Sequence, residues 1–246
     1  MDKRVKGISV VLASYNSKPQ WLVDSVVSCL SAKQTWDGEI EVVLVDDGST
    51  DDLTKYTQDK LSQFKGVNLI RLEENVGLPA ALNQGIINST HDWIARQDDD
   101  DISLPERFQT QVDFIEKTPD CKIIGSQIYF YQNGKRSKIT GHQHLVTSDI
   151  LNTNSRHWFF NHGTLLAEKS LLCKVGMYDS NLNESWQPED WDLWRRLLES
   201  GVNIYNLPEK LYEYRVHGDN KSQIGMQKKL NWMDSQIKPI KEYGTQ

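Results

Sequence analysis

The chain has 246 residues, of which 38% are hydrophobic and 25% are charged, and its formal net charge is −6 at pH 7. This composition can bury a sizeable core and excludes general disorder. The negative charge, with no long run of lysine or arginine, argues against nucleic acid as a partner. A divalent cation could still recruit an anionic ligand, because it reverses the local sign of the charge.

The cysteines and the apolar runs indicate the compartment. Cys29, Cys121 and Cys173 are scattered, which favours reduced thiols over a disulfide framework or a zinc site. The N-terminal apolar run of about six residues is too short for a signal peptide. No stretch approaches the roughly 20 apolar residues that span a bilayer. We expect a cytoplasmic protein, with peripheral contact at the inner membrane face left open.

Apolar runs alternate with amphipathic segments along the first half of the chain. Buried strands are predicted at 7–14, 39–47, 66–72 and 91–98. Helices are predicted at 19–32, 49–64, 78–89 and 104–117. Four such pairs predict an α/β fold with a Rossmann-like, mostly parallel sheet and helices on both faces. Ligands bind beyond the carboxyl ends of the strands in such sheets.

The second half is less regular and predicts a smaller mixed region. A hairpin at 121–139 turns at Asn133 and Gly134. A helix at 188–201 begins with acids and stops at Gly201. Strands are predicted at 162–168, 202–207 and 211–216, and a terminal helix at 226–242. Residues 141–160 match no clear pattern.

Four aspartates stand in a row at 98–101, directly after the fourth predicted strand. Adjacent acids held there raise one another's pKa values and cost stability, unless a divalent cation offsets their charge. Mg²⁺ or Mn²⁺ typically takes one or two carboxylates plus phosphate oxygens. The alternative is a solvated acidic loop that caps the helix near Pro105. An EF-hand is disfavoured, since the required glycine and glutamate are missing.

Six motifs set this loop in context, and they occur in the order SVVLASYNS, VVLVDDGSTDD, EENVGLPAALNQGI, WIARQDDDDISLPERF, QPEDWDLWRRL and YRVHGDNKS. Together they resemble the family 2 glycosyltransferases with the GT-A fold, over roughly residues 7–222. The resemblance implies transfer of a sugar from a nucleotide diphosphate to an acceptor hydroxyl with inversion. It divides the domain into a nucleotide-binding half at 1–117 and an acceptor-binding half at 118–222, followed by a helical extension at 223–246.

The resemblance implies a nucleotide-contact loop at Ala13, Tyr15 and Asn16. Ala13 stands where the family often has proline, and backbone contacts to the base survive that change. Tyr15 offers a ring that can pack on the base; its alternative is an ordinary half-buried tyrosine.

The next rim segments imply further donor contacts. Asp47 resembles the acid that accepts a hydrogen bond from a pyrimidine N–H, which favours a UDP-sugar first and a dTDP-sugar second. Its alternative is an Asx turn before a helix cap, and Asp46 supports the loop. Asn75 and Gly77 match an Asn-x-Gly segment whose glycine lets the backbone approach the nucleotide. Arg96 would offset the aspartates or touch the donor.

Within the aspartate run, the family pattern implies distinct roles. Asp98 and Asp100 become the two acids of an Asp-x-Asp motif, and Asp99 occupies the variable place. Asp100 is the first choice for a metal ligand, while Asp98 meets the ribose or a metal-bound water. His217 is the ligand expected from the far end of the domain, and a neutral imidazole suits Mn²⁺ better than Mg²⁺.

The acceptor side needs a base that takes the proton from the attacking hydroxyl. Asp190 matches the family's base, and Glu189 would bind an acceptor hydroxyl or orient the loop. Capping of a helix by acids is the alternative for both. Trp186 could stack on an acceptor sugar. His162 is a weaker candidate that lines the acceptor cleft or holds a strand end.

Two rival functions remain at this stage. A sugar-nucleotide nucleotidyltransferase is disfavoured, because ASYNSKP is not a Gly-rich, basic triphosphate loop. A catalytically inactive nucleotide- or carbohydrate-binding module on the same fold is the stronger alternative. The acceptor is expected to be a glycan or a lipid-linked sugar of cell-surface polysaccharide synthesis. The lysines at 228, 229, 238 and 241 could touch a membrane surface, although packing on the core is the preferred reading.

Overall fold

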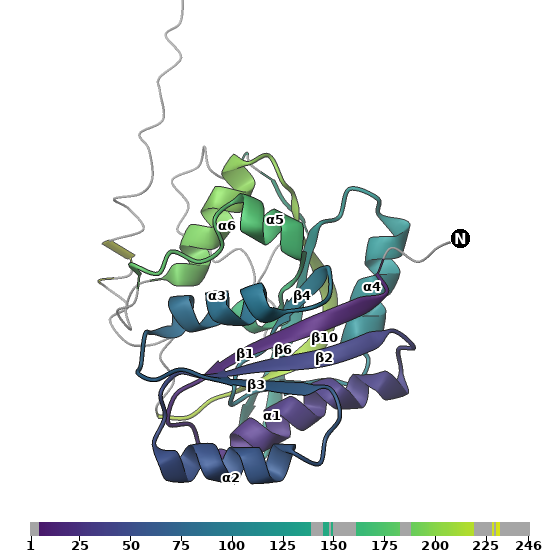
Figure 1. Ribbon diagram of the computed structural model, residues 1–246. Helices are drawn as coiled ribbons and strands as arrows, with labels where there is room; N and C mark the ends of the chain where they lie inside the picture. The colour runs from purple at the N-terminus through teal and green to yellow at the C-terminus, as the bar shows by residue number, and fades with distance from the viewer. Residues whose placement is uncertain are drawn as a thin grey trace, which may run out of the picture.

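The computed structural model describes residues 5–138, 145–147, 149, 161–182, 188–218, 228, 230 and 231 (Figure 1). The α-helices among these residues are α1 (Pro19–Ser31), α2 (Asp51–Leu61), α3 (Leu78–Asn88), α4 (Arg107–Lys117), α5 (Lys169–Lys174) and α6 (Glu189–Glu199). The strands are β1 (Gly7–Ser14), β2 (Glu39–Asp46), β3 (Val67–Arg71), β4 (Trp93–Arg96), β5 (Ile102–Ser103), β6 (Ile123–Gln132), β7 (Lys135–Lys138), β8 (Leu145–Val146), β9 (Leu166–Glu168) and β10 (Ile204–Arg215).

The strands form one sheet in the order β3-β2-β1-β4-β9-β6-β10-β5, with β7 beside β6 and β8 beside β10. Strands β1 to β4 run parallel, as do β6 and β10, and β9 lies antiparallel between β4 and β6. The predicted α/β class with a mostly parallel sheet is confirmed. Because β1, β2 and β4 are parallel, their carboxyl ends share one rim, where the predicted nucleotide loops emerge.

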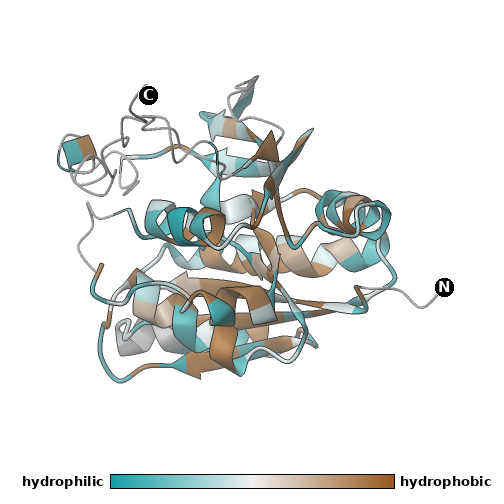
Figure 2. Ribbon diagram, turned by 90° about the horizontal axis from the view of Figure 1, so that it is seen from above, coloured by the Kyte–Doolittle hydropathy of each residue, from teal (hydrophilic) through white to brown (hydrophobic). Residues whose placement is uncertain are grey.

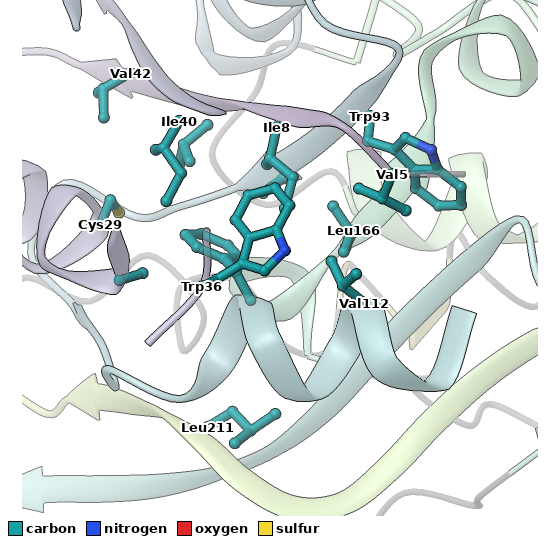
Figure 3. Packing of buried hydrophobic residues seen from close by; sticks show 14 of the residues in the cluster. Val5, Ile8, Cys29, Trp36, Ile40, Val42, Trp93, Val112, Leu166 and Leu211 are labelled. Carbon is teal, nitrogen blue, oxygen red and sulfur yellow. The ribbon is translucent and has the colours of Figure 1, made fainter. Parts of the chain in front are cut away.

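Helices cover both faces of the sheet, with α1 and α2 opposite α3 (Figure 1). The side chains of β1 point to both faces of the sheet. Ile8 packs in the hydrophobic cluster under α1 and α4, and Val11 packs in the cluster under α3, α5 and α6. Figure 3 shows part of the first cluster, including Trp36 and Val112. The central strands are mostly hydrophobic and the helices are mixed (Figure 2), as a buried sheet with amphipathic covers requires.

Several predicted element boundaries were wrong. The segment at 162–168 is a 3₁₀ turn at His162–Thr164 followed by the short strand β9. The strands at 202–207 and 211–216 are one strand, β10, whose pairing with β6 shifts register between Leu207 and Lys210. Pro208 lies at that shift, where the strand pairing is interrupted and no backbone N–H is needed.

Helix α4 begins at Arg107 and not at 104, because β5 forms just before it and pairs with β10. The hairpin predicted at 121–139 is present as β6 and β7. The segment at 141–160 and the helix at 226–242 fall almost wholly outside the described residues, and the division of the chain into two halves stays a prediction. Among the described residues, no helix combines the length and hydrophobicity that crossing a membrane requires.

Helix α3 packs closely on β1 through Gly85. A Cβ atom at this position would lie 2.4 Å from Val11 Cγ1, in the middle of the buried sheet. Gly85→Ala should lower the free energy of unfolding by about 1–3 kcal/mol through overpacking, although alanine favours the helix by itself. Gln84→Ala, at the exposed neighbouring position, is the control for denaturant unfolding. A stabilised Gly85→Ala variant would contradict the close packing.

Candidate active site

The aspartate run begins where β4 ends, beside the end of β1. Gln97 donates its backbone N–H to Val11 of β1 (3.1 Å), which extends the pairing by one residue. Below it, the buried Arg107 binds Gln97 Oε1 at 3.0 Å and Ser103 Oγ at 2.8 Å, on either side of the run. Arg107 also donates to the main-chain carbonyl of Arg96 at 2.9 Å. The loop is therefore held at both ends from beneath.

Each of the four aspartates has a different environment, so the run is not a solvated loop tip. Asp98 forms an ion pair with the buried Arg96. Asp99 accepts a hydrogen bond from Ser17, and Asp100 lies 2.7 Å from His217 Nε2. Asp101 is fully buried and accepts a hydrogen bond from the backbone N–H of Arg215 at 2.7 Å.

Packing these acids together shifts their pKa values upward. Burial, which outweighs the hydrogen bond from Ser17, raises the pKa of Asp99 to about 6. Burial and the charge of Asp98 raise the pKa of Asp100, against the effect of His217, and raise the pKa of Asp101 well above its usual range. Burial disfavours the charge of Arg96, yet Asp98 beside it raises the pKa of its guanidinium. Four acids are thus crowded at the rim, with the buried Arg96 in direct contact with one of them.

The structure brings together two side chains that could bind a divalent cation, Asp100 and His217. Asp100 and His217 come from opposite ends of the domain and meet at the rim, and both side chains are only partly exposed. No group of three or more His, Cys, Asp or Glu in the described part of the chain is arranged to hold a metal ion. A carboxylate and an imidazole suit a cation that takes its other ligands from phosphate and water.

The predicted nucleotide loop lies at the end of β1 and is tied to the end of β2. Asn16 has a left-handed backbone conformation (φ 51°). Its N–H donates to Ser49 Oγ at 2.9 Å, and its Oδ1 accepts from the N–H of Thr50 at 3.1 Å. Ala13 is partly buried at the strand end, while Tyr15 is 47% exposed. The exposed ring is available for stacking, and its contact with a base stays a prediction.

Asp47 is buried and organises the neighbouring loop. Its carboxylate accepts hydrogen bonds from the N–H groups of Val76 and Gly77 and from the side chain of Asn75, at 2.8–3.0 Å. Asp46 makes the Asx turn, accepting from the N–H of Ser49 at 2.9 Å. The structure thus brings Asp47, Asn75 and Gly77 together, and it gives Asp47 a loop-supporting role that the sequence assigned to Asp46. A contact between Asp47 and a pyrimidine stays a prediction.

The acceptor-side acids begin helix α6. Asp190 accepts a hydrogen bond from the N–H of Trp191 at 2.7 Å, and Glu189 lies 3.8 Å from His162 Nδ1. Burial, reinforced by Arg96, lowers the pKa of His162 well below its usual range, so the ring is neutral. The predicted Trp186 falls outside the described residues.

His162, which the sequence offered as a weaker candidate, joins the aspartate loop to the acceptor-side acids, and its partners Tyr178, Gly163 and Tyr212 were not predicted. His162 Nε2 lies 2.6 Å from the hydroxyl of Tyr178. At the adjoining Gly163, a Cβ atom would stand 2.4 Å from the Tyr212 hydroxyl and 2.8 Å from Asp98 Oδ2. The segment at 162–163 therefore touches the aspartate loop on one side and the start of α6 on the other. The only sequence signal was a glycine beside a histidine.

The raised pKa of Asp99 has a consequence for stability. Its folded pKa of about 6 exceeds the ordinary 3.8, so the native state binds this proton more tightly than the unfolded state does. The ionised Asp99 therefore lowers the free energy of unfolding above pH 6, and this loss is relieved as the pH falls toward 4. Asp99→Asn should stabilise the cation-free protein at pH 7.5 by about 1–3 kcal/mol and should flatten the pH dependence. Asp59→Asn, on the exposed surface of α2, should do neither, and equal pH profiles for both variants would contradict this electrostatic account.

Comparison with known proteins agrees with this geometry. The family model for glycosyl transferase family 2 matches residues 9–176. The amylovoran biosynthesis glycosyltransferase AmsE of Erwinia amylovora is 30% identical over 239 residues, which cover 93% of this chain and 82% of that protein. An Escherichia coli UDP-Gal:alpha-D-GlcNAc-diphosphoundecaprenol beta-1,3-galactosyltransferase is 27% identical, with 88% and 77% covered.

A solved structure supports the same fold. The crystal structure of S. aureus TarS 1–349 in complex with UDP-GlcNAc superposes with a TM-score of 0.69 at 21% identity. The match covers 88% of this chain and 60% of that one, so the chain spans less than two thirds of this structural relative. Because the family model covers well over half of the residues, the chain belongs to glycosyl transferase family 2 and is a glycosyltransferase.

Proposed function

We propose that the chain is a metal-dependent, inverting glycosyltransferase that moves a sugar from a UDP-sugar, or second a dTDP-sugar, to a hydroxyl of a glycan or lipid-linked acceptor. The observation that carries the proposal is the contact between Asp100 and His217 at the rim of the sheet. The segment at 162–163 lies between the aspartate loop and the acids at the start of α6. One side can hold a donor diphosphate, and the other can activate an acceptor.

On the donor side, the rim loops supply the nucleotide contacts. The exposed ring of Tyr15 stacks on the base, while backbone groups of Ala13 and Asn16 border it. Gly77 has a positive φ of 90° and no side chain, so its backbone can approach the ribose closely. Asp98, which Arg96 orients, would meet the ribose or a metal-bound water, and Asp99 would lie beside the donor. The UDP-GlcNAc complex of the TarS relative supports a UDP-sugar as donor.

Asp100 and His217 would hold the cation, Mn²⁺ or Mg²⁺. When bound, the cation stabilises the charge that develops on the departing diphosphate. Asp100 would hold it as a carboxylate, and His217 would hold it through the Nε2 that faces Asp100 in this structure. These residues are positioned by β10 and by the loop after β4, so the site is built on the sheet itself.

On the acceptor side, Asp190 takes the proton from the attacking hydroxyl, and Glu189 orients that acceptor. The neutral His162 and the buried Tyr178 back Glu189. Relatives named for amylovoran biosynthesis and for a diphosphoundecaprenol-linked acceptor support cell-surface polysaccharide synthesis. A cytoplasmic location with peripheral contact at the inner membrane face belongs to the same proposal.

Asp190→Asn should reduce sugar transfer by about 10²–10⁴-fold, the usual contribution of a general base. Binding of UDP, measured calorimetrically with Mn²⁺, should change little, because Asp190 lies on the acceptor side. Glu199→Gln, at the exposed end of the same helix, is the matched control and should leave transfer unchanged. An equal loss of nucleotide affinity and of rate in Asp190→Asn would remove this residue from the role of base.

Asp100→Ala should abolish the extra thermal stabilisation that Mn²⁺ adds to UDP binding. The control is Asp113→Ala on the exposed face of α4. Full Mn²⁺-dependent stabilisation and turnover in Asp100→Ala would exclude this residue as a metal ligand. If the unaltered protein bound UDP with Mn²⁺ but never released it from any nucleotide sugar, the chain would be an inactive binding module.

A further inference from the structure

The loop after helix α5 holds a strained residue. Gly176 and Met177 both have left-handed backbone conformations, with φ values of 89° and 56°. The N–H of Met177 donates to the carbonyl of Leu172 at 2.8 Å and closes the end of α5. Such a helix cap favours one glycine but does not need a second left-handed residue. Because a side chain at positive φ persists only where its surroundings hold it there, the conformation of Met177 depends on contacts outside the helix.

Two other helices supply those contacts. Arg196 of α6 donates to the carbonyls of Val175 at 2.6 Å and Met177 at 2.7 Å. Asn83 of α3 donates its side-chain amide to the carbonyl of Tyr178 at 2.8 Å and accepts from the Tyr178 N–H at 3.0 Å. The Asn83 amide thus pairs with the backbone of Tyr178 as a neighbouring strand would. The loop is held between α3 and α6, and the backbone of Tyr178 is fixed.

This loop places one polar group, the hydroxyl of Tyr178, inside the protein. The residue is 3% exposed, and its hydroxyl lies 2.6 Å from His162 Nε2. Burial raises the pKa of Tyr178 above its usual range, so the hydroxyl keeps its proton. Burial and the charge of Arg96 lower the pKa of His162, so its ring carries a single N–H. A short hydrogen bond therefore joins two neutral groups.

Glu189 sets the direction of this hydrogen bond. Nδ1 of His162 lies 3.8 Å from Glu189 Oε1. If the ring proton were on Nε2, the lone pair of Nδ1 would face the carboxylate, which would repel it. A proton on Nδ1 points the N–H at the carboxylate and leaves Nε2 to accept from Tyr178. The geometry favours this second tautomer, in which the Tyr178 hydroxyl donates to the ring and the ring presents its N–H to Glu189.

We propose that Tyr178 and His162 are positioning residues for the acceptor, because they hold the Glu189 carboxylate where it can orient the attacking sugar hydroxyl. Asn83 acts one step further back, since it fixes the backbone of Tyr178. The proposal rests on the proposed function, which gives Glu189 its role toward the acceptor. None of these residues lies in the loops that we assign to the nucleotide, so their loss should impair use of the acceptor and spare the binding of UDP.

Nitrogen NMR of the full chain, labelled with isotope-enriched histidine, tests the geometry directly. The His162 signals are assigned by their loss in His162→Asn, and they should show the Nδ1–H tautomer at neutral pH. Tyr178→Phe removes only the hydroxyl and should shift the Nε2 signal, because Nε2 loses its hydrogen-bond donor. Tyr205→Phe is the matched control. Its hydroxyl donates to Asp120 at 2.7 Å near the start of β10, and its removal should leave the His162 signals unchanged.

The transfer assay tests the role of these residues in the reaction. Tyr178→Phe should lower kcat/KM for the acceptor about tenfold, the effect of one hydrogen bond, and should leave the affinity for UDP with Mn²⁺ unchanged. Tyr205→Phe should change neither value. His162→Asn keeps an N–H near the position of Nδ1 and should retain more transfer than His162→Ala, which keeps none.

Four results would overturn the proposal: an Nε2–H tautomer in the unaltered protein, equal transfer by the two tyrosine variants, equal transfer by the two His162 variants, or a parallel loss of UDP affinity in Tyr178→Phe. If Tyr178→Phe did not fold, the tautomer of the unaltered protein and the pair of His162 variants would still decide the question. A chain that shows the expected tautomer but transfers no sugar would refute the proposed function, while the chain of hydrogen bonds would stand.

Discussion

The site depends on the burial of positive charge beneath a run of negative charge. Arg107 is fully buried, and the pKa of its guanidinium is lowered by that burial. It faces neutral partners, Gln97 and Ser103, and carbonyl oxygens. Arg96 above it carries the ion pair with Asp98. Without these two cations the four aspartates would be too costly to hold at the end of a buried strand.

This arrangement makes the loop a rigid element between two functional surfaces. The side chain of Asp98 faces Arg96 and Tyr212, while its main-chain carbonyl accepts from Ser25 of α1 at 2.6 Å. Asp101 is fixed by the backbone of Arg215 at the end of β10. The loops proposed to hold the donor and the pair Asp100–His217 are thus attached to one sheet, and the segment at Gly163 lies between this sheet and the start of α6.

Local sequence patterns predicted much of this structure. Short continuous apolar runs identified β1, β2 and β4 as buried strands, and because those strands are parallel, their shared rim followed from them. The meeting of Asp100 with His217 was expected only from the family resemblance, since 117 positions separate them. The 3₁₀ turn at His162–Thr164 was missed, because a close approach of Gly163 to Tyr212 depends on distant residues. The continuity of β10 was missed because a proline usually ends a strand. Pro208 is accommodated by a shift in the pairing of β10 with β6, which the sequence does not reveal.

The three hydrogen bonds that Asp47 accepts from the segment at 75–77 have an entropic consequence. A loop rich in small and polar residues, with a positive φ at Gly77, would ordinarily sample many conformations. Here a buried carboxylate selects one of them during folding. The proposed nucleotide would then meet a surface whose shape is already set, so its binding would carry little entropic cost for ordering the chain.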